Sequence, residues 1–171
     1  AISVSPAFQN YRIAAQRPGG LETIGLRNLL RPGIPASDAC NRPPQVPMPI
    51  APFRALGTHP LVWTAADAGP APGGGVNSAS VVQTLIVEDT RPPDVKAPPA
   101  VVVESATAPV AIVTGTPQVF DVVDLEPAVE RDGPASFPFG VTVLRWRAID
   151  GSGNASPWVE QRITVKPLGS N

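Results

Sequence analysis

His59 is the only histidine in the chain, so a serine–histidine–aspartate catalytic arrangement would have to use it. It lies directly before Pro60 at the start of an expected strand, and the sequence contains no Gly-x-Ser-x-Gly nucleophile turn. These features favour a turn or strand-edge role over catalysis. One histidine and one cysteine, Cys40, are too few for a tetrahedral zinc site. The sequence therefore predicts no enzyme activity, no catalytic residue and no cofactor-binding residue.

Carboxylates offer a second kind of chemistry. Asp67 and Asp150 follow equivalent strands of an internal repeat, and Asp89 lies at the expected domain junction. Calcium takes six to eight oxygen ligands, which acidic side chains and backbone carbonyls at a junction could supply, so Asp67 and Asp89 are candidate calcium ligands. The favoured alternative is that Asp67 and Asp150 accept hydrogen bonds from the backbone of their own turns.

Trp158 is the third candidate, because it stands in a turn just before the last expected strand. Pro157 precedes it and Glu160 follows two positions later, which suggests a partly exposed aromatic platform for a sugar or a protein. Packing against the neighbouring proline and the sheet edge is the alternative, and it is the more common fate of such a residue.

The composition indicates short strands joined by proline- and glycine-rich turns. The 171 residues include 23 Pro and 15 Gly, yet 43% are hydrophobic and the formal net charge is only −1, which argues against a disordered chain. Neither a basic cluster nor an apolar stretch of about 20 residues is present, so we expect neither a nucleic-acid partner nor a membrane span. The start at Ala1 suggests a processed or excised part of a longer precursor.

An internal repeat divides the sequence into two halves. Residues 57–67 align without a gap against residues 140–150, with Gly, Trp, Ala and Asp at one constant offset and an aromatic, Phe53 or Phe137, shortly before each Gly. A turn and a further strand follow in each half, at residues 81–87 and 159–165. Each half is therefore predicted to contain a hairpin.

Alternation in the second hairpin predicts which side chains face the core. Thr142, Leu144, Trp146 and Ala148 share one face of the first strand, and the Trp side is expected inward. In the closing strand the expected inward set is Val159, Gln161, Ile163 and Val165. By the same reasoning Trp63 anchors the core of the first half.

The remaining segments are less regular. Early strands are expected around Ile13 and Leu21 in the first half and between residues 101 and 123 in the second. Residues 26–30 could form one helical turn, and the proline-rich residues 31–52 are expected to form an extended loop with at most an edge strand. Pro92 and Pro93 form a stiff connector, which predicts domains at residues 1–90 and 91–171.

The pattern resembles the hyalin repeat, an immunoglobulin-like module that occurs in tandem in extracellular and cell-surface proteins. The resemblance rests on residues 56–67 with 38–40 in the first half, and on residues 88–93, 98, 101–104, 137–140, 143–150, 153–156 and 163–165. The first half departs from it by replacing the short Gly-Asn turn with a Gly/Pro loop. The resemblance implies an adhesive or spacer role and no reaction.

The sequence therefore predicts an all-β protein of two tandem immunoglobulin-like antiparallel β-sandwich domains. The first functional hypothesis is a non-enzymatic extracellular structural or adhesion module of a larger secreted or surface protein, with protein partners, copies of itself or a carbohydrate as ligand. The second is a filament subunit that donates residues 1–7 as a β-strand to a neighbouring copy. The third is an accessory domain of a secreted hydrolase.

Overall fold

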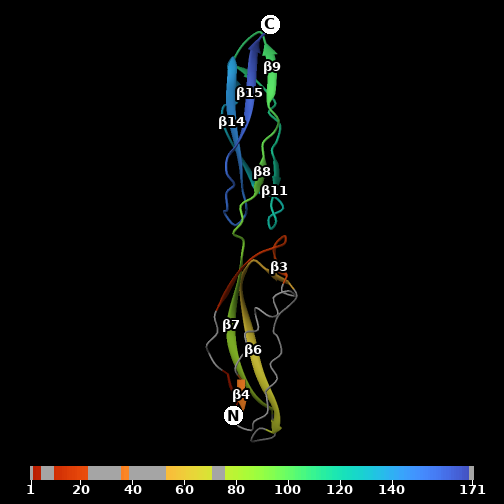
Figure 1. Cartoon of the computed structure of the whole chain (residues 1–171), viewed down its shortest axis with the longest axis vertical. Coiled ribbons are helices and arrows are strands. Elements are labelled where there is room, and N and C mark those ends of the chain that lie inside the picture. The colour runs from red at the N-terminus through yellow and green to blue at the C-terminus, as the bar shows by residue number, and fades with distance from the viewer. Residues whose placement is uncertain (1, 5–9, 23–35, 39–52, 71–75, 170–171) are drawn as a thin grey trace. The chain divides into compact units, whose positions relative to one another are not determined.

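The computed structural model describes residues 2–4, 10–22, 36–38, 53–70 and 76–169, with side chains at 10–22, 53–66 and 78–169. Every regular element among these residues is a β-strand. The chain divides into two compact units, Ala1–Asp89 and Thr90–Asn171 (Figure 1). Within the described residues there is no helix of the length and apolarity needed to cross a membrane.

Unit 1 is built around a long antiparallel hairpin. Strands β6 (Gly57–Pro70) and β7 (Val76–Glu88) form the hairpin, and β2 (Tyr11–Ala14) pairs with the other side of β7. Two short antiparallel pairs accompany this sheet: β1 (Ile2–Val4) with β4 (Ala36–Asp38), and β3 (Gly20–Glu22) with β5 (Phe53–Ala55).

Unit 2 repeats this plan with a fourth strand in its main sheet. The sheet has the order β12–β14–β15–β9, from β12 (Ala128–Asp132), β14 (Gly140–Ile149), β15 (Val159–Pro167) and β9 (Val101–Ser105). The remaining strands form two short antiparallel pairs: β8 (Asp94–Lys96) with β11 (Gln118–Phe120), and β10 (Val110–Ala111) with β13 (Ser136–Phe137).

The expectation of wholly antiparallel sheets is wrong at one edge of each unit. β2 runs parallel to β7 in unit 1, and β9 runs parallel to β15 in unit 2. Two parallel neighbouring strands need a long connection between them. Here an early strand of each unit pairs with its last strand, so the connection includes most of the unit. Such a pairing leaves no local signal in the sequence.

The predicted inward faces of the second hairpin are confirmed. Leu144, Trp146 and Ala148 are buried on β14. On β15 the buried side chains are Gln161, Ile163 and Val165, with Val159 half-buried beside them. Phe137 completes this core, and the half-buried β9 residues Val101 and Val103 pack against it. The alternation of the strand therefore determines the core of unit 2.

Unit 1 buries the equivalent positions. Leu61, Trp63 and Ala65 on β6 face inward together with Leu85 and Val87 on β7. The strand pairing is also equivalent, because Gly57 pairs with Val87 and Gly140 pairs with Val165. Both glycines have positive φ, 124° and 105°, so each first strand of a hairpin starts from a backbone conformation that favours glycine.

The aromatic residues before these glycines are not equivalent. Phe137 is fully buried, whereas Phe53 is 46% exposed. Phe137 stands three residues before Gly140 and pairs with Val110. In unit 1 the residue three positions before Gly57 is Arg54, which pairs with Leu21. Successive side chains of a strand point to opposite faces, so the difference of one position places Phe53 on the outer side.

Several predictions fall on other parts of the chain. The possible helical turn at residues 26–30 and the role of Cys40 lie outside the described residues. Of the expected loop at residues 31–52, the structure describes β4, a short strand that pairs with β1.

A buried tryptophan–glutamine hydrogen bond recurs in the two units. Trp63 Nε1 donates to Gln83 Oε1 at 3.0 Å, and Trp146 Nε1 donates to Gln161 Oε1 at 3.1 Å. The glutamines hold equivalent positions, because Gln83 pairs with Leu61 and Gln161 pairs with Leu144. A buried indole N–H needs such an acceptor, since an unpaired buried donor costs roughly 1–3 kcal/mol.

In unit 2 the same glutamine also binds the segments around β9 and β10. Gln161 Nε2 donates to the carbonyl oxygen of Pro99 at 2.8 Å and to that of Thr114 at 2.7 Å. One side chain therefore makes hydrogen bonds with three polar groups and connects the closing strand to two distant segments.

Replacing Gln161 with Leu should destabilise unit 2 by about 3 kcal/mol or more, because three polar groups lose their partner at roughly 1–3 kcal/mol each. Hydrogen exchange followed by mass spectrometry can measure this unit by unit, with faster exchange expected in unit 2 and unchanged exchange in unit 1. The exposed neighbour substitution Arg162→Ala is the control and should change stability by less than about 0.5 kcal/mol. If the backbone amides of unit 2 exchanged equally slowly in the Gln161→Leu and Arg162→Ala variants, the proposed role of Gln161 would be wrong.

Candidate functional site

Trp158 lies on the outer face of unit 2, stacked against an arginine. Arg147 and Trp158 face each other across the hairpin, one position beyond the last paired residues, Trp146 and Val159. The Arg147 guanidinium carbon is 4.7 Å from the centre of the Trp158 ring, and Trp158 remains 40% exposed. The predicted partial exposure of Trp158 is therefore confirmed, and Arg147 covers one face of its ring. Its use as a binding platform stays a prediction.

Arg147 is held in this position by an ion pair with the edge strand. Glu130 on β12 pairs with Arg147 in the ladder, and its Oε2 accepts a hydrogen bond from Arg147 Nε at 2.6 Å. The arginine is only 31% exposed, which makes this pair better shielded than an ordinary surface salt bridge. Glu130, Arg147 and Trp158 thus form a continuous row across the sheet, called here the Trp158 ledge.

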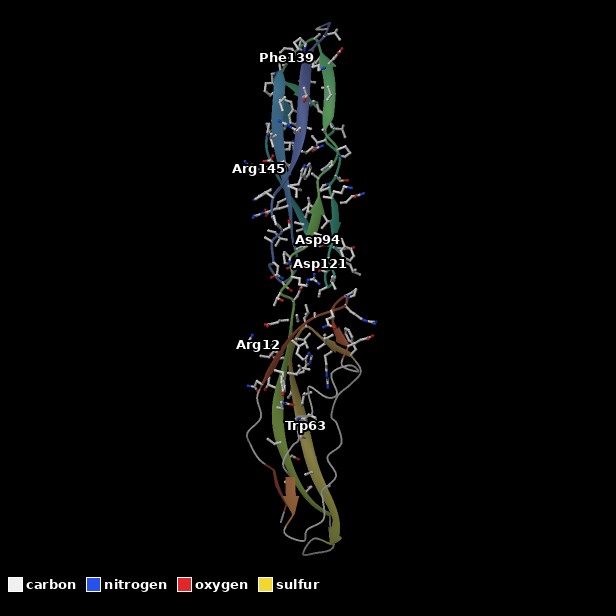
Figure 2. All side chains as sticks on the ribbon, in the orientation of Figure 1. Arg12, Trp63, Asp94, Asp121, Phe139 and Arg145 are labelled. Carbon is white, nitrogen blue, oxygen red and sulfur yellow. The ribbon has the colours of Figure 1, made fainter. Side chains whose placement is uncertain are left out.

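A second charged row lies beside the ledge. Arg145 pairs with Asp132 on one side and with Glu160 on the other, and Arg145 Nε is 3.9 Å from Glu160 Oε1. Figure 2 shows Arg145 extending outward from β14. These side chains are well exposed, so they contribute little to stability and form a polar border for the aromatic ring.

Unit 1 has a different surface at the same positions of its hairpin. Thr64 and Ser80 take the places of Arg147 and Trp158, and their hydroxyl oxygens are 2.9 Å apart. Val62 and Val82, both exposed, take the places of Arg145 and Glu160. The hairpin therefore forms with or without an aromatic residue at this point, so the fold does not require Trp158.

Asp150 has the turn-capping role that was the favoured alternative to metal binding. Its Oδ1 accepts hydrogen bonds from the backbone N–H groups of Ser152 at 2.9 Å and Asn154 at 2.8 Å, and its Oδ2 accepts one from Asn154 Nδ2 at 2.8 Å. The carboxylate is buried within the turn that it organises.

A second aspartate loop supports this turn, and the sequence reasoning missed it. Asp121 Oδ1 accepts from the backbone N–H groups of Val123 at 2.7 Å and Asp124 at 2.8 Å. Asp124 Oδ2 in turn accepts from the N–H of Gly151 at 2.8 Å. Asp121 and Asp124, three positions apart, could have indicated Asx turns, but nothing in the sequence connects them with Gly151.

The structure does not bring the two candidate calcium ligands together. Asp67 is near the far end of β6, whereas Asp89 follows β7 at the end where Val87 pairs with Gly57. Asp67 lies ten residue steps beyond Gly57, which correspond to about 33 Å of strand, so one ion cannot contact both carboxylates. The side chain of Asp67 lies outside the described residues, and no three His, Cys, Asp or Glu side chains within the described ranges form a metal-binding group. A calcium role for either residue alone stays a prediction.

His59 has a local structural contact. It lies half-buried on β6, and its Nε2 is 2.7 Å from the carbonyl oxygen of Ala55 four residues earlier. This contact connects β6 to the end of β5, as expected for a strand-edge residue.

A shallow hollow of about 300 Å³ lies over the β8–β11 pair of unit 2. It is lined by all the residues of these two strands: Asp94, Val95, Lys96, Gln118, Val119 and Phe120. The exposed Phe120 pairs with Asp94 in the ladder.

The described strands define the chain as an all-β protein of two sandwich-like units. No family model matches the chain, and no curated protein matches it. Similar solved structures include human protocadherin-24 EC1-2, with a TM-score of 0.41, 13% identity and coverage of 98% of this chain and 99% of that one. Fibronectin(III)-like modules of Clostridium thermocellum CbhA have a TM-score of 0.32 at 17% identity, covering 100% and 98%. The human desmocollin-1 ectodomain has a TM-score of 0.36 at 12% identity, covering 99% and 42%.

Replacing Asp150 with Ala should loosen the turn between β14 and β15, because two backbone N–H groups and one amide lose their acceptor. We expect a loss of about 1–3 kcal/mol in the stability of unit 2, measured by urea unfolding. Asp150→Asn keeps one side-chain oxygen and should lose less. If Asp150→Ala were as stable as the unchanged chain, the capping role would be wrong.

Proposed function

We propose that this chain is a non-enzymatic extracellular structural or adhesion module, part of a larger secreted or surface protein and built from hyalin-repeat-like units. The tandem arrangement of two similar sandwich units supports this role. The described site residues support it too, because His59, Asp150 and Arg147 are each engaged in structural contacts. A rigid scaffold with variable outer faces is suited to binding other macromolecules.

The Trp158 ledge is the observation that carries this proposal. Trp and Arg are the residues most enriched at energetic centres of protein interfaces, and a border of charged side chains is the usual surrounding. Unit 2 has both features, whereas the equivalent positions of unit 1 carry Thr64 and Ser80. A residue that the fold does not need and that exposes an aromatic ring is best explained by a partner. We propose a protein partner, including a second copy of the chain, with carbohydrate as the alternative ligand.

Trp158→Ser reproduces in unit 2 the residue that unit 1 has at the equivalent position. We expect beads coated with the unchanged chain to aggregate, and the variant to weaken this binding about thirtyfold, as for loss of roughly 2 kcal/mol at an interface centre. Stability should fall by no more than about 1 kcal/mol, the value of an exposed cation–π contact.

Val82→Ser is the matched control, because Val82 is an exposed outer-face residue of the other unit. It should leave aggregation unchanged. If beads coated with the unchanged chain stay dispersed, a second copy is ruled out as the partner. If the unchanged chain binds an array of neutral oligosaccharides and the Trp158→Ser variant does not, the result favours carbohydrate as the ligand.

A filament subunit is the second candidate. β1 pairs with β4 of its own chain through only three residue pairs, so the same pairing could be exchanged with a neighbouring copy. Electron microscopy should then show ordered polymers that disappear when residues 1–7 are deleted, and a monomer at high concentration would contradict this candidate. For the third hypothesis, an accessory domain of a secreted hydrolase, the length of the encoded precursor is the test.

A further inference from the structure

The parallel edge of unit 2 determines how the unit responds to tension along the chain. β9 and β15 pair through five consecutive residues, from Val101 opposite Ile163 to Ser105 opposite Pro167. Because the two strands run in the same direction, the beginning of β9 and the end of β15 lie at opposite ends of this ladder. Chain enters β9 at one end and leaves β15 at the other.

Tension applied between the start of β9 and the end of β15 therefore pulls these neighbouring strands in opposite directions along their own axes. This is shear, in which all hydrogen bonds of the ladder are strained together. Antiparallel terminal strands would have both ends at the same side, and tension would break their bonds one after another. We propose that the β9–β15 ladder is a shear clamp that lets unit 2 resist mechanical tension, a function beyond partner binding.

Two contacts lengthen the clamp beyond the paired strands. Residues 98 and 99 are both Pro and can donate no backbone hydrogen bond to β15, but the carbonyl oxygen of Pro99 accepts one from Gln161 Nε2 at 2.8 Å. At the other end the N–H of Leu168 donates to the carbonyl oxygen of Ser105 at 2.9 Å. The closing strand is thus bound to the entering segment from residue 99 to residue 105.

The clamp is also anchored in the core. Trp146 holds Gln161 in position through the hydrogen bond to its Oε1. β15 pairs on its other side with β14, and Ile163 and Val165 are buried between the sheets. Val101 and Val103 of β9 pack against the same core. Sliding β9 along β15 would therefore disrupt apolar packing together with the ladder.

Unit 1 has the same arrangement made from different residues. β2 and β7 pair in parallel over four residues, and the N–H of Ala15 donates to the carbonyl oxygen of Glu88 at 2.8 Å beyond the ladder. At the other end Asn10 Oδ1 accepts from the N–H of Thr84 at 3.3 Å. The recurrence supports a role for the parallel edge that does not depend on one particular sequence.

Single-molecule pulling of the full chain in two directions tests the clamp without altering it. Handles on Ala100→Cys and Leu168→Cys load the ladder in shear, and handles on Thr107→Cys and Leu168→Cys peel it from the end where Ser105 pairs with Pro167. Both proteins carry Cys40→Ser. The three handle positions in unit 2 are exposed, so the two proteins should have similar melting temperatures.

We expect the unfolding force in shear to be several times the force in peeling, because forced unfolding is governed by the barrier along the pulled direction. Equal forces, or a lower force in shear, would overturn the clamp. That result would leave the binding role of Trp158 untouched, and failure of bead aggregation would leave the clamp untouched. The two proposals are therefore tested separately.

Discussion

The buried hydrogen bond between a tryptophan and a glutamine is the interaction on which both units depend. The indole is the largest group of each core, and burying it requires an acceptor for its N–H. That acceptor is on the closing strand in both units, at Gln83 and at Gln161. A slip of one residue in the hairpin would move the glutamine to the outer face and leave the indole unpaired. The pair therefore stabilises the core and also fixes the register of the hairpin.

The two units provide an internal comparison of which residues the fold needs. Their inner faces share the tryptophan and the leucine two residues before it, at Trp63 with Leu61 and at Trp146 with Leu144. Their outer faces have not, since a pair of hydroxyl groups in unit 1 stands where unit 2 has Arg147 stacked on Trp158. Inner positions are constrained by close packing, whereas exposed sheet positions tolerate most changes. Differences between the units are therefore most informative on the outer face.

Sequence reasoning succeeded where the signal was local and periodic. Alternation placed Trp146 inward, and the aspartate after the strand indicated the turn cap at Asp150. It failed for features that join distant segments: the parallel edge strands, the two carbonyl partners of Gln161 and the separation of Asp67 from Asp89. Trp158 could be proposed from the sequence, but its arginine cover depends on the register across the hairpin.

The proposed binding surface and the proposed clamp use different side chains of unit 2. The Trp158 ledge runs across the outer face from β12 over β14 to the residue before β15, and the clamp joins β15 to β9. β15 therefore belongs to the clamp and begins directly after Trp158. The two proposals depend on different side chains, because Trp158 is partly exposed whereas Gln161 is directed into the core. A module of this kind can change its partner by substitution of exposed residues and still resist the tension that binding transmits.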